Sequence, residues 1–403
     1  MGRRDRILLF ITYTWNMKSK TQVYIFLSFL GIISLINGIT DPWGSSIGFI
    51  GRYARWAFDY SHGFTKRGLV GEAVSLVNPH LSIANVQVAY FSALVVLLFL
   101  LPLYYLYFID NSNQEDTILF ALWGITCTGT IQQYAYDVAR FDIFGALIII
   151  LSVVAVKFLK SDKLKICLVI LASFLSVMIH EAYFLWVFPS LLFVYFFDKT
   201  KFSYSKLILI SVPVFVFTLY VGTSSPNDFG SATGLASSLS NTTSFEVSVR
   251  RTQPLYRSLY ESIKYNIDAL NPPINLFNFI LASFCFSFVL YPCLYSLYNL
   301  YSYLDNNYVY IYSIFVISII CPLFLYGLGF DHGRWWAMSM TSFSILYITI
   351  IRGPHEEYIR ETTFPKRYFI AVGIIMNVFL GPAGVTSLFP KSYTYRFIET
   401  ILF

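Results

Sequence analysis

Long apolar runs separated by short polar segments make up most of the chain. A helix needs about 20 apolar residues to cross the hydrocarbon layer of a membrane, with a range of about 17 to 25. Runs of this kind lie near 22–40, 88–108, 117–133, 142–158, 166–179, 182–197, 207–222, 276–299, 308–328, 335–351 and 368–384. The pattern predicts an all-α, polytopic integral membrane protein with about eleven transmembrane helices, in which residues 1–403 form a single membrane domain.

Composition supports this class of protein. Hydrophobic residues make up 56% of the chain and charged residues only 12%, against about 25% charged residues in soluble domains. The cysteines lie inside apolar runs without a CxxC motif, so neither a disulfide framework nor a zinc site is expected. The first run begins near Gln22 and lacks a small-residue cleavage site, which favours a retained helix over a signal peptide.

The distribution of lysine and arginine predicts an orientation. With the N-terminus in the cytoplasm, the inner segments carry most of the positive residues in short turns, as the positive-inside rule requires. These residues are Arg3, Arg4, Arg6, Lys18, Lys20, Lys157, Lys160, Lys163, Lys165, Lys199, Lys201, Lys206, Arg352, Arg360, Lys366 and Arg367. Two long segments, about 41–87 and about 223–275, then become outer loops.

Short interfacial helices are expected in both outer loops. Residues 69–77 have the pattern of an amphipathic helix lying on the membrane surface. The second loop is expected to open with a flexible Ser/Gly/Asn stretch over 222–241. It then continues as a helix with Pro254 in its first turn. This helix could cover a bound substrate or simply lie at the interface.

Polar clusters gather where this threading places the outer face. Asp59, His62, Lys66 and Arg67 fall within one stretch of the first loop. The other clusters are Arg140 with Asp142, His180 with Glu181, and Asp331 with His332 and Arg334. Ion pairs that hold helices together would explain some of them. Ionisable groups at membrane depth also mark functional cavities, so the clusters indicate a candidate active site on this face.

The chemistry of these side chains favours a phosphorylated sugar substrate. Arginine offers paired donors to phosphate, a carboxylate can accept a proton during glycosyl transfer, and histidine can act as a base. The candidate catalytic residues are Asp59, His62, Asp331 and His332. The candidate substrate-binding residues are Lys66, Arg67, Arg140, Asp142, His180, Glu181, Arg250, Arg251 and Arg334. The carboxylates and histidines could also share a divalent cation, but the sequence assigns it no ligands.

The many spans, the charged first outer loop with its surface helix and the further long outer loop resemble two kinds of membrane glycosyltransferase. One is the GT-C fold, which uses polyprenyl-phosphate sugars and carries a catalytic aspartate in the first outer loop. Asp59 is the closest match and Asp41 the second. The other is the Wzy type of O-antigen or capsule repeat-unit polymerase. That resemblance implies roles for Arg250, Arg251 and Arg257 in handling the lipid-linked glycan.

We therefore expect transfer or polymerisation of polyprenyl-pyrophosphate-linked sugars, as in O-antigen or capsule biosynthesis, on the periplasmic face of a bacterial cytoplasmic membrane. The expected partners are the lipid-linked glycan, membrane lipid and other polysaccharide-assembly proteins, with no nucleic acid. A glycan flippase or exporter is the main alternative, although charge inside the spans would then be expected. A membrane O-acyltransferase, with His180 as its membrane histidine, is the third.

Overall fold

The structure is a computed structural model of the chain. It describes residues 20–39, 51–61, 63–108, 114–197, 202–225, 230–257, 306–327, 331–351 and 367–384, together with the single positions 260, 261, 264, 280 and 298. The described residues form helices and connecting turns, with one isolated bridge between Leu81 and Thr243. The all-helical prediction is therefore confirmed for this part of the chain.

The helices follow the apolar runs closely. The long ones are α2 (Lys20–Gly38), α5 (Ile83–Phe108), α6 (Gln114–Thr126), α8 (Asp142–Phe158), α9 (Asp162–Ile179), α10 (Val187–Phe197), α11 (Tyr204–Thr223), α16 (Asn306–Ile320), α17 (His332–Ile351) and α19 (Arg367–Leu380). The short ones are η1 (Ala54–Ala57), α4 (Gly68–Ser75), α7 (Ile131–Tyr136), η2 (Glu181–Phe184), α12 (Ala232–Thr242), α13 (Val249–Tyr256) and η3 (Cys321–Gly327). The predicted run at 276–299 lies outside the described residues.

Within the described residues, four helices are long and apolar enough to cross a membrane: α2, α5, α11 and the continuous segment Tyr308–Leu325 over α16 and η3. Together they indicate a membrane protein. The remaining long helices are shorter or less apolar, so the expected number of about eleven crossings stays a prediction.

The outward faces of these helices are apolar, which suits contact with lipid. Phe29 of α2 is 57% exposed, Val96 of α5 is 53% exposed and Val216 of α11 is 58% exposed. The bundle interior holds polar side chains as well as apolar ones. Helix α17 buries a series of hydroxyl side chains, Ser339, Thr341, Ser342, Ser344 and Thr349. Soluble bundles have the reverse pattern, a polar exterior around an apolar core.

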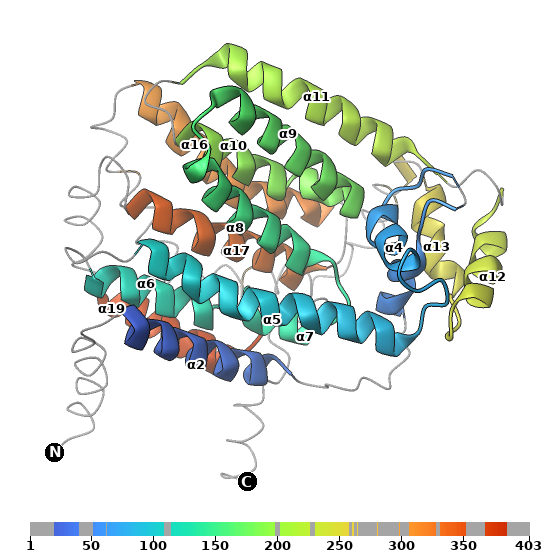
Figure 1. Cartoon of the computed structure of the whole chain (residues 1–403), viewed down its shortest axis with the longest axis horizontal. Coiled ribbons are helices and arrows are strands. Elements are labelled where there is room, and N and C mark those ends of the chain that lie inside the picture. The colour runs from blue at the N-terminus through green and yellow to red at the C-terminus, as the bar shows by residue number, and fades with distance from the viewer. Residues whose placement is uncertain are drawn as a thin grey trace, which may run out of the picture.

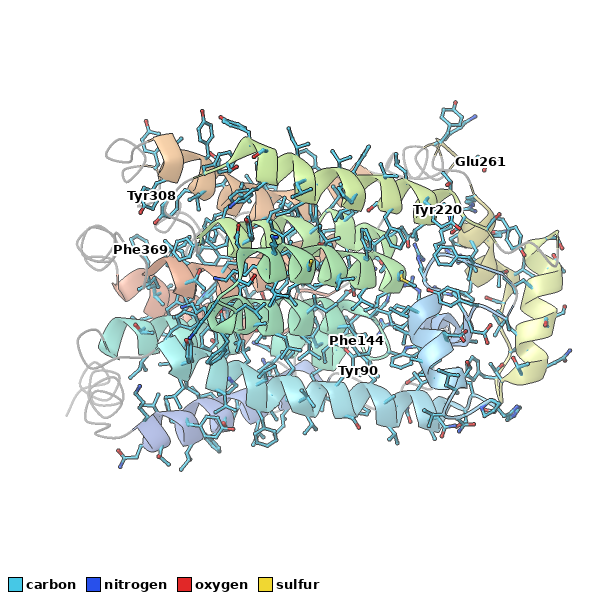
Figure 2. The ribbon with its side chains drawn as sticks, turned by 45° about the horizontal axis from the view of Figure 1, so that its top comes forward. Tyr90, Phe144, Tyr220, Glu261, Tyr308 and Phe369 are labelled. Carbon is cyan, nitrogen blue, oxygen red and sulfur yellow. The ribbon has the colours of Figure 1, made fainter. Side chains whose placement is uncertain are left out.

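The long helices run side by side and place their ends in two groups (Figure 1). The short helices α4, α12 and α13 all lie at the end where α8 begins and α9 finishes. The turn between α8 and α9 lies at the opposite end. Figure 2 shows the same division, with Tyr308 and Phe369 near one end and Tyr220 near the other. We call the group with the short helices the capped end and the other group the open end.

The two long loops fold partly as predicted. Helix α4 matches the predicted 69–77 segment to within about two residues at each end. The prediction for the second loop is wrong in two respects. The later part of the Ser/Gly/Asn stretch, from Ala232, forms α12, because Leu235 and Leu239 bury one face and Ser231 accepts a hydrogen bond from the Gly234 N–H at 3.2 Å. Pro254 lies near the end of α13 rather than in a first turn.

Candidate functional site

The first loop is docked into the capped end rather than projecting from it. Trp56 of η1 donates its indole N–H to the carbonyl of Ala139 at 2.8 Å, and its ring packs against Phe141 and Phe144. Helix α4 sits tightly on the same loop, because a Cβ at Gly71 would lie 1.9 Å from the Phe58 carbonyl oxygen. The charged residues on η1 and before α4 are therefore held against the start of α8.

An alternating chain of ion pairs links three distant segments at this end. Arg52 Nη1 lies 3.1 Å from Asp137, and Asp137 lies 3.5 Å from Arg140 Nε. Arg140 Nη1 lies 3.0 Å from Asp331, which also contacts Arg334 Nη1 at 3.2 Å.

The last link of this chain is its most buried. Arg334 donates from Nε and Nη2 to the two carboxylate oxygens of Asp142, at 2.5 Å each. The side chains of Arg334 and Asp142 are 2% and 5% exposed. Two parallel N–H···O bonds of this kind fix both direction and distance, which a lysine could not do. The heads of α8 and α17 are thereby joined.

A second ion pair lies beside this chain. Arg67 donates from Nε and Nη2 to the carboxylate of Glu181, which also approaches Nδ1 of His180 at 3.5 Å. Arg67 holds a left-handed backbone with φ of 67°, a conformation that costs about 1 kcal/mol or more for a residue with a Cβ. Ala139 is the other non-glycine residue with a positive φ in the described part of the chain, and its φ is 66°. Both strained positions flank the charged cluster.

Asp331 has an electrostatic environment unlike that of an ordinary carboxylate. Burial alone would raise its pKa, but Arg140 and Arg334 hold the pKa of Asp331 well below its usual range. Asp331 is thus a fixed anion at neutral pH. Such a group holds cations in place more readily than it accepts a proton.

The second loop packs against the first loop and adds positive charge to the cluster. Arg251 of α13 is half-buried, and its guanidinium lies against the backbone of Gly51, next to Arg52. Lys66 is buried and donates from Nζ to the Arg257 carbonyl at 3.3 Å. Burial lowers the pKa of Lys66. These contacts tie both loops to one site.

A short backbone bridge fixes the second loop further. The Leu81 N–H donates to the Thr242 carbonyl at 3.1 Å, and the Ser244 N–H donates to the Leu81 carbonyl at 2.9 Å. The bridge joins the residues before α5 to the turn that follows α12. The position of α13 over the site is therefore set at two places.

Most of the predicted substrate-binding residues come together, namely Lys66, Arg67, Arg140, Asp142, His180, Glu181, Arg251 and Arg334, along with the predicted catalytic residue Asp331. Arg250 is exposed on α13, and its charge contributes to lowering the pKa of Arg251. Asp59 is half-buried in the loop after η1, where it accepts hydrogen bonds from the backbone N–H and the hydroxyl of Ser61.

The structure describes little of two predicted catalytic residues. His62 lies outside the described residues, and of His332 only the backbone, at the start of α17, is described. No group of three or more histidine, cysteine, aspartate or glutamate side chains among the described residues is arranged to hold a metal ion. The described carboxylates Asp137, Asp142, Glu181 and Asp331 contact arginine instead.

Sequence reasoning did not include Arg52, Arg55 or Asp137 among the site residues. A usable signal was present, because Arg52 and Arg55 are three residues apart and share one face of a helical turn. Asp137 likewise lies three residues before the predicted Arg140. In comparisons with known proteins, no family model, no curated protein and no solved structure matches the chain.

Proposed function

We propose that the chain transfers or polymerises polyprenyl-pyrophosphate-linked sugars, with its active site at the capped end and that end facing the periplasm. The observation that carries this proposal is a surplus of positive charge over carboxylates there. The cations of this cluster are Arg52, Arg55, Lys66, Arg67, Arg140, Arg251 and Arg334, and the carboxylates paired with arginine in it are Asp137, Asp142, Glu181 and Asp331. A lipid diphosphate carries its charge just outside the hydrocarbon layer, where a cationic site at the end of an apolar bundle meets it.

The arrangement suits glycosyl transfer. An acceptor hydroxyl attacks the anomeric carbon, the bond from that carbon to the diphosphate oxygen breaks, and the diphosphate leaves with the electron pair. Arginines held in place beforehand stabilise the charge that develops on the leaving group. The hydroxyl proton needs an acceptor. Asp59 is the better placed of the candidate carboxylates, because its hydrogen bonds are local and no arginine pairs with it among the described residues.

Transfer explains the charge distribution better than export does. A flippase would be expected to bind its substrate at the middle of the membrane and to open alternately to both faces. The charged cluster here lies at the helix ends, between the first loop, the head of α8, the head of α17 and α13. The described lysines of the predicted cytoplasmic turns belong to the other end, where Lys206 pairs with Asp162 at 2.6 Å.

The test is the length distribution of surface polysaccharide in the host strain. A deletion strain is complemented with wild type, Arg251→Gln or Asp59→Asn. For both variants we expect single-repeat glycan in place of a ladder, with transfer reduced about a hundredfold or more when one charge-stabilising or proton-accepting group is lost. The control is Lys163→Gln, which removes an exposed positive charge at the open end.

Membrane levels of each variant are measured alongside the glycan. A full ladder from Lys163→Gln and none from the two site variants supports the proposal. A ladder of normal length that lacks one sugar branch assigns transfer of a side branch instead of polymerisation. Full complementation by both site variants contradicts the proposal.

A further inference from the structure

Arg55 is a half-buried cation without a counter-ion among the described residues. Its Nη1 is enclosed by protein and has no hydrogen-bond partner, and no carboxylate forms an ion pair with it within the described residues. A buried charge normally persists in a protein only when it is paired. A ligand of opposite charge would supply the missing partner.

The neighbours of Arg55 make its isolation more costly. Burial, and then the charges of Arg140, Arg67 and Arg334, hold the pKa of Arg55 well below its usual value, while Asp331 opposes them. Asp331 is already shared between Arg140 and Arg334. The carboxylate that acts on Arg55 therefore has little charge left to neutralise it.

Arg251 repeats this situation on the second loop. It is half-buried, no ion pair to it occurs in the described part of the chain, and its guanidinium lies against Gly51 in the helical turn that carries Arg52 and Arg55. Burial and the charge of Arg140 lower the pKa of Arg251. Two guanidinium groups without carboxylates, one from each loop, thus lie close to the same ion-pair chain.

We propose that Arg55 and Arg251 bind the diphosphate group of the substrate between them, so that the anion holds α13 onto the first loop. The proposal rests on the proposed function only in taking the diphosphate to be lipid-linked. A diphosphate fits better than a single carboxylate, because it offers several charged oxygens to planar donors on two sides. Lys66, whose pKa is lowered by burial, lies within the same cluster and adds to the local positive charge.

The test measures binding without catalysis. Purified full-length chain in nanodiscs of zwitterionic phosphatidylcholine is titrated with inorganic pyrophosphate, farnesyl diphosphate or glucuronic acid, at a fixed salt concentration. Affinity and the shift in melting temperature are recorded for each. We expect Arg55→Gln and Arg251→Gln each to weaken diphosphate binding about tenfold to a hundredfold, and Lys163→Gln to leave it unchanged.

A second readout separates binding from a structural role. Arg55→Gln removes an uncompensated charge, so the ligand-free variant is expected to melt at the same or a higher temperature than wild type while losing the ligand-induced shift. Melting below wild type, or diphosphate affinity equal to wild type, would overturn the proposal. So would a shift produced by glucuronic acid alone.

The choice of ligand identifies the source of the anion. A shift with farnesyl diphosphate alone assigns the site to a lipid headgroup, and a shift with both diphosphates assigns it to the diphosphate group itself. Each of these results supports the proposal. A further outcome separates the two proposals. If the wild-type chain binds diphosphate and the variants bind it more weakly, yet the variants still complement the deletion strain, the glycosyl-transfer function is contradicted and the anion site stands.

Discussion

The two ends of the bundle use charge differently. At the open end, Lys206 at the start of α11 pairs with Asp162 at the start of α9, and the two side chains are 39% and 36% exposed. At the capped end, Arg334 and Asp142 form a bidentate ion pair that is almost wholly buried. Arg334 also contacts Asp331, which pairs in turn with Arg140. Exposed pairs contribute about 0–1 kcal/mol, whereas a buried pair is costly to break. The charge network at the capped end is therefore expected to be costlier to disrupt than the exposed pair at the open end.

The sharpest way to break this comparison is Arg334→Gln. It leaves Asp142 buried without its two-pronged partner and is expected to lower the free energy of unfolding by about 3–5 kcal/mol. Unfolding of the purified chain in detergent micelles, followed by tryptophan fluorescence, measures the loss. The matched change at the open end is Lys206→Gln, with an expected loss below about 1 kcal/mol. Equal losses from the two variants would show that burial does not distinguish the ends.

A smaller effect is expected from Gly71→Ala, which tests how tightly α4 is fastened to the capped end. The added methyl group meets the Phe58 carbonyl oxygen at 1.9 Å, so the helix has to move. We expect a loss of about 1–3 kcal/mol. The control is Gly222→Ala near the end of α11, where a Cβ meets nothing within 4 Å. That change is expected to stabilise the helix by up to about 1 kcal/mol; a loss there as large as at Gly71 would contradict the packing argument.

The smallest effect appears only in acid. The pKa of Asp331 in the folded chain is below its unfolded value of about 3.9. Its ionised form therefore contributes stability that is fully present above about pH 4 and is lost as the pH falls through the lower, folded pKa. The melting temperature measured from pH 6 to pH 3 is expected to fall less steeply for Asp331→Asn than for wild type. Parallel curves would show that the arginines do not favour the ionised carboxylate.

The positions of the helices could be predicted because hydrophobicity is a local property. Helix α8 covers 142–158, the same residues as the predicted run, and the prediction over 207–222 differs from α11 only by a few residues at each end. The Ser/Gly/Asn stretch was interpreted wrongly because Leu235 and Leu239 form a buried face that only tertiary contacts reward.

The partners within the site could be predicted only in part. That charged residues gather at one end follows from the threading, since alternate turns of a membrane bundle meet on the same side. Which arginine meets which carboxylate does not, because Arg140 and Asp331 are 191 residues apart. The isolation of Arg55 is harder still to foresee, because it depends on its neighbours already having partners.

The bond between Asp142 and Arg334 joins two parts of the chain that are synthesised at different times. The two residues are separated by 192 positions, and ribosomes add about 5–20 residues per second. The head of α8 is therefore made roughly 10–40 seconds before its partner on α17. A chain cut short in that interval exposes a carboxylate at the mouth of an apolar helix. Such a carboxylate is a chemical mark by which quality-control machinery could distinguish unfinished chains from finished ones.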